Sequence, residues 1–457
     1  MEIAGIQIWA LLGFLFAAYA VVGNDALQTL GTFINSNRRL HWTVLFGFAA
    51  TVLVVTFTFG WLIYDGDPSY QRLSNTDKYP VIDIQWYHTL PPLVLLVITR
   101  LGIPVSTSFM VLTIFASVAG LGSMIEKSLF GYGLAFVVGL GVYLLISKTL
   151  EKRFEEIPVG TNVPRGLIVG VGTVFLLASN FLVAIKDDRE AAAETGAAIT
   201  PLIDLFMATA TSPVILGLIG LVVVVEILAN IQAGKDRVRY WVAAQWVTTG
   251  YLWAVWLIQD FANIFVFLPR ELTAIQGFVA MIMIVVLLGY TFWNQGGPVQ
   301  KILKSKSNVT DIRSATIIDF IYASLLFFFK ELNDLPMSTT WVFLGLIAGR
   351  EYGFAIMRKT FMNGVAILDT MSDLAKAFIG LVISINLAVA LPMIGAMMSG
   401  DPISSMTEFF RYFVIAANAM LIVSLYFLFR KDKPATTVFF VTMAAGAIVF
   451  FANANQF

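Results

Sequence analysis

Apolar runs of about 20 residues recur along the chain, and they limit the folds that are open to it. Because an α-helix rises 1.5 Å per residue, each run can cross a hydrocarbon core about 30 Å thick. Hydrophobic residues make up 58% of the chain and charged residues 13%, with a mean hydropathy of +0.82. A soluble fold could not cover its surface with so few charges. The runs lack the period-two alternation of a membrane barrel, so the sequence predicts an all-α polytopic membrane protein.

The number of membrane helices follows from these runs. They lie near residues 6–23, 43–64, 89–101, 108–125, 129–147, 166–185, 213–234, 240–258, 273–293, 314–329, 341–356, 376–399, 410–429 and 435–453. Several are short or interrupted by polar residues, so we expect roughly 10–12 full crossings together with some half-helices. The first run has no basic flank and no small-residue cleavage site, so we expect a membrane helix there.

Charged connectors divide the chain into parts. The loop Lys301–Arg313 is the clearest basic connector, and basic loops favour the cytoplasmic side of a membrane. We therefore expect this loop on the cytoplasmic side, and the orientation of the remainder stays open. We expect an integral protein of the cytoplasmic (inner) membrane. Its expected parts are a first transmembrane repeat at 1–150, connecting helices and loops at 151–239, a second transmembrane repeat at 240–360 and C-terminal transmembrane helices at 361–457.

Charge and residue usage exclude several classes of function. With 29 basic and 29 acidic residues the formal net charge is zero, so no basic field is available for nucleic acid. The chain has no cysteine and two histidines, His41 and His88, which argues against a disulfide framework and against a zinc enzyme. No nucleophile–base constellation is evident. We therefore expect neither an enzyme nor a resident cofactor.

Two polar segments recur in the same order in each half of the chain. Asn24–Gln28 precedes Pro104–Ser108, and Gln259–Asn263 precedes Pro336–Thr340. The offset is 235 residues between Asp25 and Asp260 and 232 residues between Ser106 and Ser338. An isolated Asn-Asp pair is a common helix cap, but a generic cap has no reason to recur with a second motif at the same distance. The duplication predicts two repeats with matching polar sites, and in so apolar a chain it points to transport.

Each Pro-x-Ser-Thr segment has the composition of a helix start. Proline is favoured in the first turn, and Ser and Thr cap the amide groups that have no partner there. The N-terminus of a half-helix offers N–H groups and a positive dipole end, and together with hydroxyls this suits an anion. Transporters with inverted-topology repeats build their sites from broken helices that meet near the membrane midplane. The alternative is ordinary helix packing through small hydroxylated residues.

The two acidic motifs need compensation inside a membrane. An Asp at mid-membrane depth costs about 2.5–3.5 kcal/mol, and two carboxylates beside an anion repel by several kcal/mol even at an effective dielectric of about 20. Neither motif contains Lys or Arg. Bound cations between the carboxylates and the anion would remove this conflict, since Asp, Asn and Gln oxygens are hard ligands. The charges therefore favour cation-coupled symport if the substrate is an anion.

The same residues resemble a known family. Val22–Thr32 is similar to the Gly-Ala-Asn-Asp-Val-Ala-Asn-Ala-Phe-Gly-Thr signature of the inorganic phosphate transporter (PiT) family. Gly102–Ser108 and Leu335–Thr340 resemble its Gly-Leu-Pro-Val-Ser-Thr-Thr-His element, present once per half. The likeness covers residues 8–125 and 240–355. It implies a symporter with two inverted repeats that moves phosphate with Na+ or, in some members, with H+.

The resemblance also implies roles for individual residues. The cation-binding residues would be Asn24, Asp25, Gln28, Gln259, Asp260 and Asn263, with Asp25 and Asp260 as the sodium ligands. The residues that donate hydrogen bonds to the anion would be Ser106, Thr107, Ser108, Ser338, Thr339 and Thr340. The implied partners are a small inorganic anion, phosphate or sulfate, co-transported Na+ or H+ and the lipid bilayer, and a homo-oligomer stays open.

The chain departs from the family pattern at several positions, and the glycine and proline after the second acidic motif are displaced within Ile264–Pro269. Gln28 and Gln259 replace asparagines and are one methylene longer, while Phe109 and Trp341 stand where the family has histidine. These differences leave the fold and the transporter class in place but leave sulfate or another small anion open beside phosphate. They also make an alternative conceivable, in which a non-transporting membrane receptor or assembly component retains the transporter fold.

Other charged residues allow more than one interpretation. Arg100 precedes the first Pro-x-Ser-Thr segment, and Lys330 and Glu331 precede the second; they could steer an anion or snorkel to the interface. Glu226 and Asp319 lie within apolar runs, where each could relay protons, bind a cation or form a buried pair.

Overall fold

The computed structural model describes part of the chain, namely residues 2–3, 5–37, 40–74, 79–100, 105–112, 118–146, 238–294, 312–327, 338–361, 364–400 and 419. Four expected spans, near 166–185, 213–234, 410–429 and 435–453, lie outside these residues apart from residue 419. Most of the expected connecting part and the basic loop at 301–311 also lie outside them. Lys330, Glu331, Glu226 and the side chain of Arg100 are also outside them.

The described residues are almost entirely helical. A short antiparallel hairpin, β1 (Glu2–Ile3) and β2 (Ile6–Gln7), precedes the first helix. The helices are α1 (Ile8–Ser36), α2 (Trp42–Ile63), the 3-10 helix η1 (Trp86–Thr89), α3 (Leu90–Arg100), α4 (Thr107–Leu112), α5 (Val118–Ile146), α11 (Val238–Phe265), α12 (Ala274–Trp293), α14 (Ile312–Phe327), α15 (Thr339–Met357) and α16 (Val365–Ser399).

Within this part of the chain, three helical stretches are long and apolar enough to cross a membrane. They are Trp42–Ile63, Met124–Leu144 and Ala274–Trp293. Two sections of α1, Ile8–Gly23 and Gln28–Ser36, meet at an angle of 46° and would count as a fourth span if taken together. The predicted all-α membrane fold is therefore confirmed, while the expected total of crossings stays a prediction.

The structure corrects the predicted ends of three runs. The runs at 6–23 and 240–258 were expected to stop before the acidic motifs, but α1 and α11 continue through them to Ser36 and Phe265. The expected break between 125 and 129 does not exist, because α5 is continuous from Val118 to Ile146. Glu126 lies on an exposed face of α5, so its charge does not require the helix to end.

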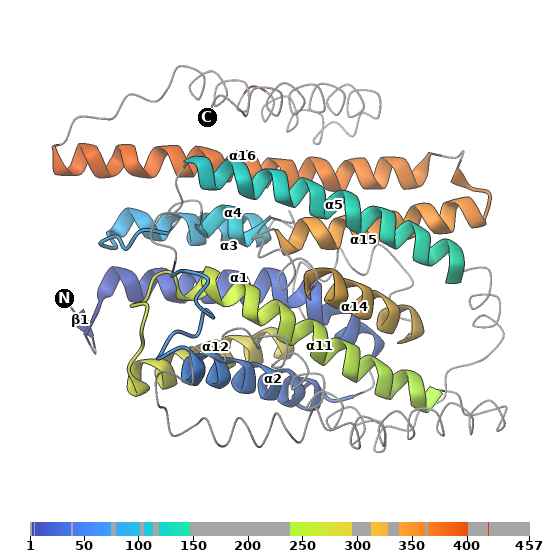
Figure 1. Ribbon diagram of the computed structural model, residues 1–457, viewed down its shortest axis with the longest axis horizontal. Helices are drawn as coiled ribbons and strands as arrows, with labels where there is room; N and C mark the ends of the chain where they lie inside the picture. The colour runs from blue at the N-terminus through green and yellow to red at the C-terminus, as the bar shows by residue number, and fades with distance from the viewer. Residues whose placement is uncertain are drawn as a thin grey trace.

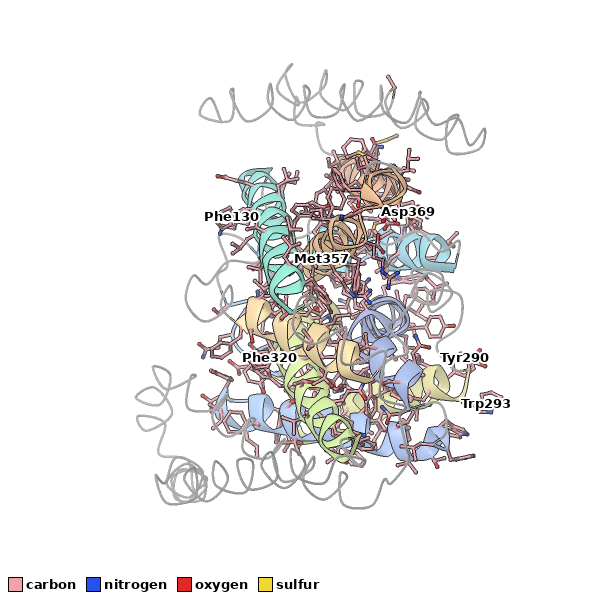
Figure 2. All side chains as sticks on the ribbon, turned by 90° about the vertical axis from the view of Figure 1, so that its right-hand side faces the viewer. Phe130, Tyr290, Trp293, Phe320, Met357 and Asp369 are labelled. Carbon is pink, nitrogen blue, oxygen red and sulfur yellow. The ribbon has the colours of Figure 1, made fainter. Side chains whose placement is uncertain are left out.

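The helices form layers (Figure 1). The motif-bearing helices α1 and α11 lie between α2 and α12 on one side and α3, α4 and α15 on the other, with α5 and α16 beyond. Every side chain of α11 from Leu252 to Phe265 is buried. Large apolar side chains instead point outward from the periphery, among them Phe130, Phe320, Tyr290 and Trp293 (Figure 2). Such faces fit a hydrocarbon surrounding.

Corresponding helices of the two halves run in opposite directions. The start of α1 meets the end of α11, where the rings of Phe14 and Phe265 are 5.6 Å apart. Just past the other end of α1, the Asn37 side-chain amide donates a hydrogen bond of 2.8 Å to Gln245, near the start of α11. The rings of Phe46, near the start of α2, and Phe292, near the end of α12, are 6.3 Å apart. An inverted repeat would produce this arrangement; the repeat itself stays a prediction.

Two further pairs of helices run parallel, α5 with α15 and α4 with α16. Gly345 and Gly349 of α15 lie directly against the α5 backbone near Tyr132 and Phe136. Small residues allow such close approach of membrane helices. This contact fixes the position of α15, which begins within the second Pro-x-Ser-Thr segment. We call the segments Pro104–Ser108 and Pro336–Thr340 the hydroxyl motifs, and Asn24–Gln28 and Gln259–Asn263 the acidic motifs. In the first half, Val105 and α4 lie along α16, where Ser384 contacts Met110.

Candidate functional site

Each acidic motif meets the hydroxyl motif of the opposite half. In the first half, the Gln28 amide donates to Oδ1 of Asp25 at 3.3 Å and to the Thr340 hydroxyl at 3.4 Å. Gln28 and Asp25 lie on α1, whereas Thr340 lies 312 residues away in sequence on α15. The longer side chain of Gln28 therefore bridges the two halves.

The second half repeats this crossed pairing with different side chains. The Asn263 amide donates to Oδ1 of Asp260, and also to the hydroxyls of Thr107 at 3.3 Å and Ser108 at 3.2 Å. The Thr107 hydroxyl donates to the same Asp260 oxygen at 3.4 Å. The Thr339 side chain approaches this carboxylate as well. Asp260 is thus surrounded by donors from both halves.

Both predicted helix starts are confirmed. Residues Thr107 and Thr339 begin α4 and α15, and in each case the preceding serine caps the helix. The Ser106 hydroxyl accepts from the Phe109 amide at 3.2 Å, and the Ser338 hydroxyl accepts from the Trp341 amide at 3.3 Å. The two starts also touch, because the Thr340 hydroxyl donates to the Val105 carbonyl at 3.3 Å.

The aromatic residues in place of the family's histidines pack against each other. The rings of Phe109 and Trp341 meet edge-on with centroids 6.3 Å apart, and both side chains are buried. They close the point where α4 and α15 meet with an apolar contact. An imidazole there would add a titratable group and a metal ligand, which this pair cannot supply.

The site is closed off from solvent and rich in oxygen. Asp25 is 0% exposed and Asp260 1% exposed. Among the described residues, Asp260 Oδ2, Asn263 Oδ1 and Gln28 Oε1 are buried without a hydrogen-bond partner. A buried carboxylate or amide oxygen without a partner costs about 1–3 kcal/mol or more, so each of these atoms favours a donor or a cation. Hard monovalent or divalent cations prefer such oxygens.

The predicted cation-binding residue Gln259 turns away from this cluster. The Gln259 amide turns to the Leu326 carbonyl, at 3.0 Å, near the end of α14. It thereby satisfies one of the carbonyls left open at a helix C-terminus. The side chain of Asn24 lies outside the described residues. In the part of the chain that the structure covers, no three His, Asp or Glu side chains form a group that could hold a metal ion.

The sequence motifs did not predict two further residues that act on the site, Tyr322 and Arg72. Tyr322 donates to the Thr339 carbonyl at 2.9 Å, and the charges of both Asp25 and Asp260 act on it. The charge of Arg72, from the loop after α2, acts on Asp260 and opposes its negative charge. The acidic motif of the second half therefore lies within electrostatic range of a cation, supplied by a loop some 190 residues from Asp260 in sequence.

The loop that carries Arg72 is folded against the helices. The Tyr70 hydroxyl donates to the Thr56 carbonyl of α2 at 2.6 Å, and the Asp67 carboxylate accepts from the Ser69 amide at 2.7 Å. Burial raises the pKa of Asp67 above its ordinary value, although hydrogen bonds from Ser69 and Gln71 and the nearby charge of Arg270 oppose the shift. The sequence did not predict that this loop folds back onto the helices, because its polar composition is typical of a connector.

Comparisons with known proteins bear on the fold. The sequence matches no protein family. It also matches no curated protein. A solved structure described as "The sodium-dependent phosphate transporter" is similar, with a TM-score of 0.51 and 16% identity over 83% of this chain and 95% of that one. The expected resemblance to phosphate transporters is thus confirmed for the fold, and this protein has the architecture of that membrane transporter.

Proposed function

We propose that this protein is a secondary transporter that carries phosphate, or a similar small oxyanion, across a membrane together with a cation, as a divergent member of the PiT family. The observation that carries the proposal is the crossed pairing of acidic and hydroxyl motifs in one buried cluster. The similar solved structure supports it, since that protein is named a sodium-dependent phosphate transporter.

The hydroxyl motifs supply the anion-binding groups in this proposal. Thr107, Ser108, Thr339 and Thr340 are all buried and lie beside the acidic motifs. A hydroxyl hydrogen can rotate toward an oxyanion while the side-chain rotamer and the backbone stay unchanged. The start of α15 adds backbone N–H groups and the positive end of a helix dipole. Arg72 adds attraction from a full positive charge.

The carboxylates hold Na+ in this proposal. Asp260 Oδ2, Asn263 Oδ1 and Gln28 Oε1 are oxygens with lone pairs and no protein donor in the described part of the chain. A cation with several oxygen ligands satisfies such a set better than a single proton does. Na+ beside Asp25 and Asp260 would also reduce the repulsion that both carboxylates exert on an incoming anion.

The antiparallel arrangement of α1 with α11 and of α2 with α12 supports a transport cycle. If the halves are inverted repeats, exchange of their conformations would open the same buried site to one side of the membrane and then to the other. The crossed hydrogen bonds lie on the boundary between the halves, so movement there would change the site directly.

The test is uptake of labelled phosphate and of labelled sulfate into proteoliposomes under an imposed Na+ gradient. The expected result is Na+-dependent uptake of at least one anion that falls to background in Asp25→Asn and Asp260→Asn. Asp369→Asn is the matched control, because Asp369 lies on an exposed face of α16 and belongs to neither kind of motif. If both site variants transport like the parent protein, the assigned site is wrong. If folded parent protein takes up neither anion, the receptor or assembly role gains support instead.

A further inference from the structure

A second buried carboxylate lies outside the cluster of the four motifs. Asp319 is on α14 and is 1% exposed. Its Oδ1 accepts a hydrogen bond of 2.6 Å from the Thr32 hydroxyl on α1, and its Oδ2 accepts one of 2.8 Å from the Thr249 hydroxyl on α11. Asp319 thereby connects α14 to both of the helices that carry an acidic motif.

Asp319 has neutral partners only, as far as the described residues show. The charged side chains described on the helices packed against α14 are Asp25 on α1, Asp260 on α11, Arg350 and Glu351 on α15, and Glu126 and Lys127 on α5. None of these acts on the Asp319 carboxylate. Asp25 and Asp260 act instead on Tyr322, one helical turn further along α14. A carboxylate at membrane depth with no balancing charge is costly, so it favours a bound proton or cation.

The two hydroxyls fit a proton better than a metal ion. A threonine hydroxyl both donates and accepts, so it can stabilise either a carboxylate or a carboxylic acid. By contrast, the side-chain amides of Gln28 and Asn263 at the proposed anion and Na+ site donate only through nitrogen and accept only through oxygen. The 2.6 Å distance to Thr32 is that of a short O–H···O⁻ bond and the 2.8 Å distance to Thr249 that of an ordinary O–H···O bond, so both carboxylate oxygens are already engaged.

We propose that Asp319 is a proton-binding site, separate from the proposed anion and Na+ site, that gains and loses one proton during each transport cycle. A proton from water adds to one carboxylate oxygen and forms the neutral acid. The new O–H group donates to one threonine hydroxyl, whose own hydrogen turns to the backbone carbonyl four residues earlier in its helix. The inference rests on the proposed transport function.

Protonation would reach the main site through α14. The charged form of Asp319 holds α1 and α11 to α14 by two charge-assisted hydrogen bonds, and the neutral form holds them less strongly. Near the other end of α14, the Leu326 carbonyl accepts a hydrogen bond from the side-chain amide of Gln259, the residue just before Asp260 in sequence. A change in how α14 is held therefore shifts the position of the acidic motif in the second half.

The first experiment measures phosphate uptake into proteoliposomes driven by a proton gradient, with equal Na+ on both sides. Parent protein and Asp369→Asn should both show this uptake. Asp319→Asn, which keeps the shape of the side chain, should lose it while it retains uptake driven by a Na+ gradient. Asp319→Glu should restore part of it. Proton-driven uptake in Asp319→Asn equal to that of the parent would overturn the inference.

The second experiment does not depend on transport. Infrared difference spectra of the purified full chain between acidic and basic pH should contain the carbonyl band of a protonated carboxyl that Asp319→Asn removes. Thr249→Val keeps the acid but removes one donor to its charged form, so the midpoint of this band should move up by about one pH unit. A band unchanged in both variants would refute the proton site. If the parent takes up no anion, the transport proposal fails, and the spectra still decide the proton site.

Discussion

Gly349→Ala should destabilise the protein, because α15 and α5 lie in backbone contact at this glycine. A methyl group added there would lie 2.8 Å from the Leu140 amide nitrogen and closer still to the Phe136 carbonyl oxygen. Both obstacles belong to the backbone of α5, so no side chain can turn away to make room. The two helices themselves must separate.

The size of the effect follows from that separation. Ordinary contact begins at 3.4 Å, so the helices must part by more than 0.6 Å at this point. A gap of about 0.5–1 Å removes a quarter to a half of the dispersion energy of the atoms that face it, and overpacking of this kind costs about 1–3 kcal/mol. Alanine returns up to about 1 kcal/mol through its higher helix propensity. We therefore expect a net loss of about 1–2 kcal/mol.

A graded set of variants makes this measurable by thermal unfolding in detergent. Gly133→Ala on α5 is the matched control, because nothing lies within 4 Å of the added methyl group. Gly353→Ala should fall between the two, with its nearest contact at 3.1 Å to Tyr143 Cβ. Anion uptake should fall in the same order, because α15 begins with Thr339 and Thr340. Equal melting temperatures for Gly349→Ala and Gly133→Ala would refute the reasoning.

Three further predictions concern charge and hydrogen bonding. Burial lowers the pKa of His88 below its ordinary value of 6.5, and its Nδ1 accepts from the Gln85 amide at 2.9 Å. The buried neutral imidazole of His88 therefore contributes its full stabilisation above about pH 6.5, and this stabilisation is lost as the pH falls through the lowered pKa. His88→Asn should remove that part of the pH dependence of the melting temperature. Asn263→Leu removes a donor to the Asp260 carboxylate, so the Na+ concentration for half-maximal uptake should change by about tenfold or more, and an unchanged value would contradict the site. Arg72→Gln should raise the half-saturating phosphate concentration and Arg72→Lys should raise it less; equal affinity in both variants would show that the charge does not act on the anion.

Local signals explain what the sequence predicted well. Proline and serine act within one helical turn, so Ser106 and Ser338 predicted the starts of α4 and α15 without information on the rest of the fold. The expected runs near 43–64 and 273–293 agree with α2 and α12 within one residue at each end. In these helices apolar composition, which decides burial in a membrane, is itself a local property.

The failures have tertiary causes. The apolar run near 6–23 stops before Asn24 and Asp25, but α1 continues through them, and the Gln28 amide that donates to the buried Asp25 carboxylate also contacts Thr340 of the other half. The pairing of Gln28 with Thr340 joins residues 312 positions apart, and no spacing rule predicts it. The charge of Arg72 acts on Asp260 because the loop after α2 folds back onto the helices, where the Tyr70 hydroxyl donates to the Thr56 carbonyl of α2.

The crossed pairing also changes the meaning of the departures from the family pattern. Gln28 is one methylene longer than asparagine, and that length lets one amide contact both Asp25 and Thr340. The shorter Asn263 contacts Asp260 and two hydroxyls that lie closer to it. The Asp260 carboxylate also accepts from the Thr107 hydroxyl of the opposite half, so different side chains donate to the two carboxylates. Since donors to a carboxylate reduce its need for a cation, the two sides should bind Na+ with different affinities even if the halves arose from one repeat.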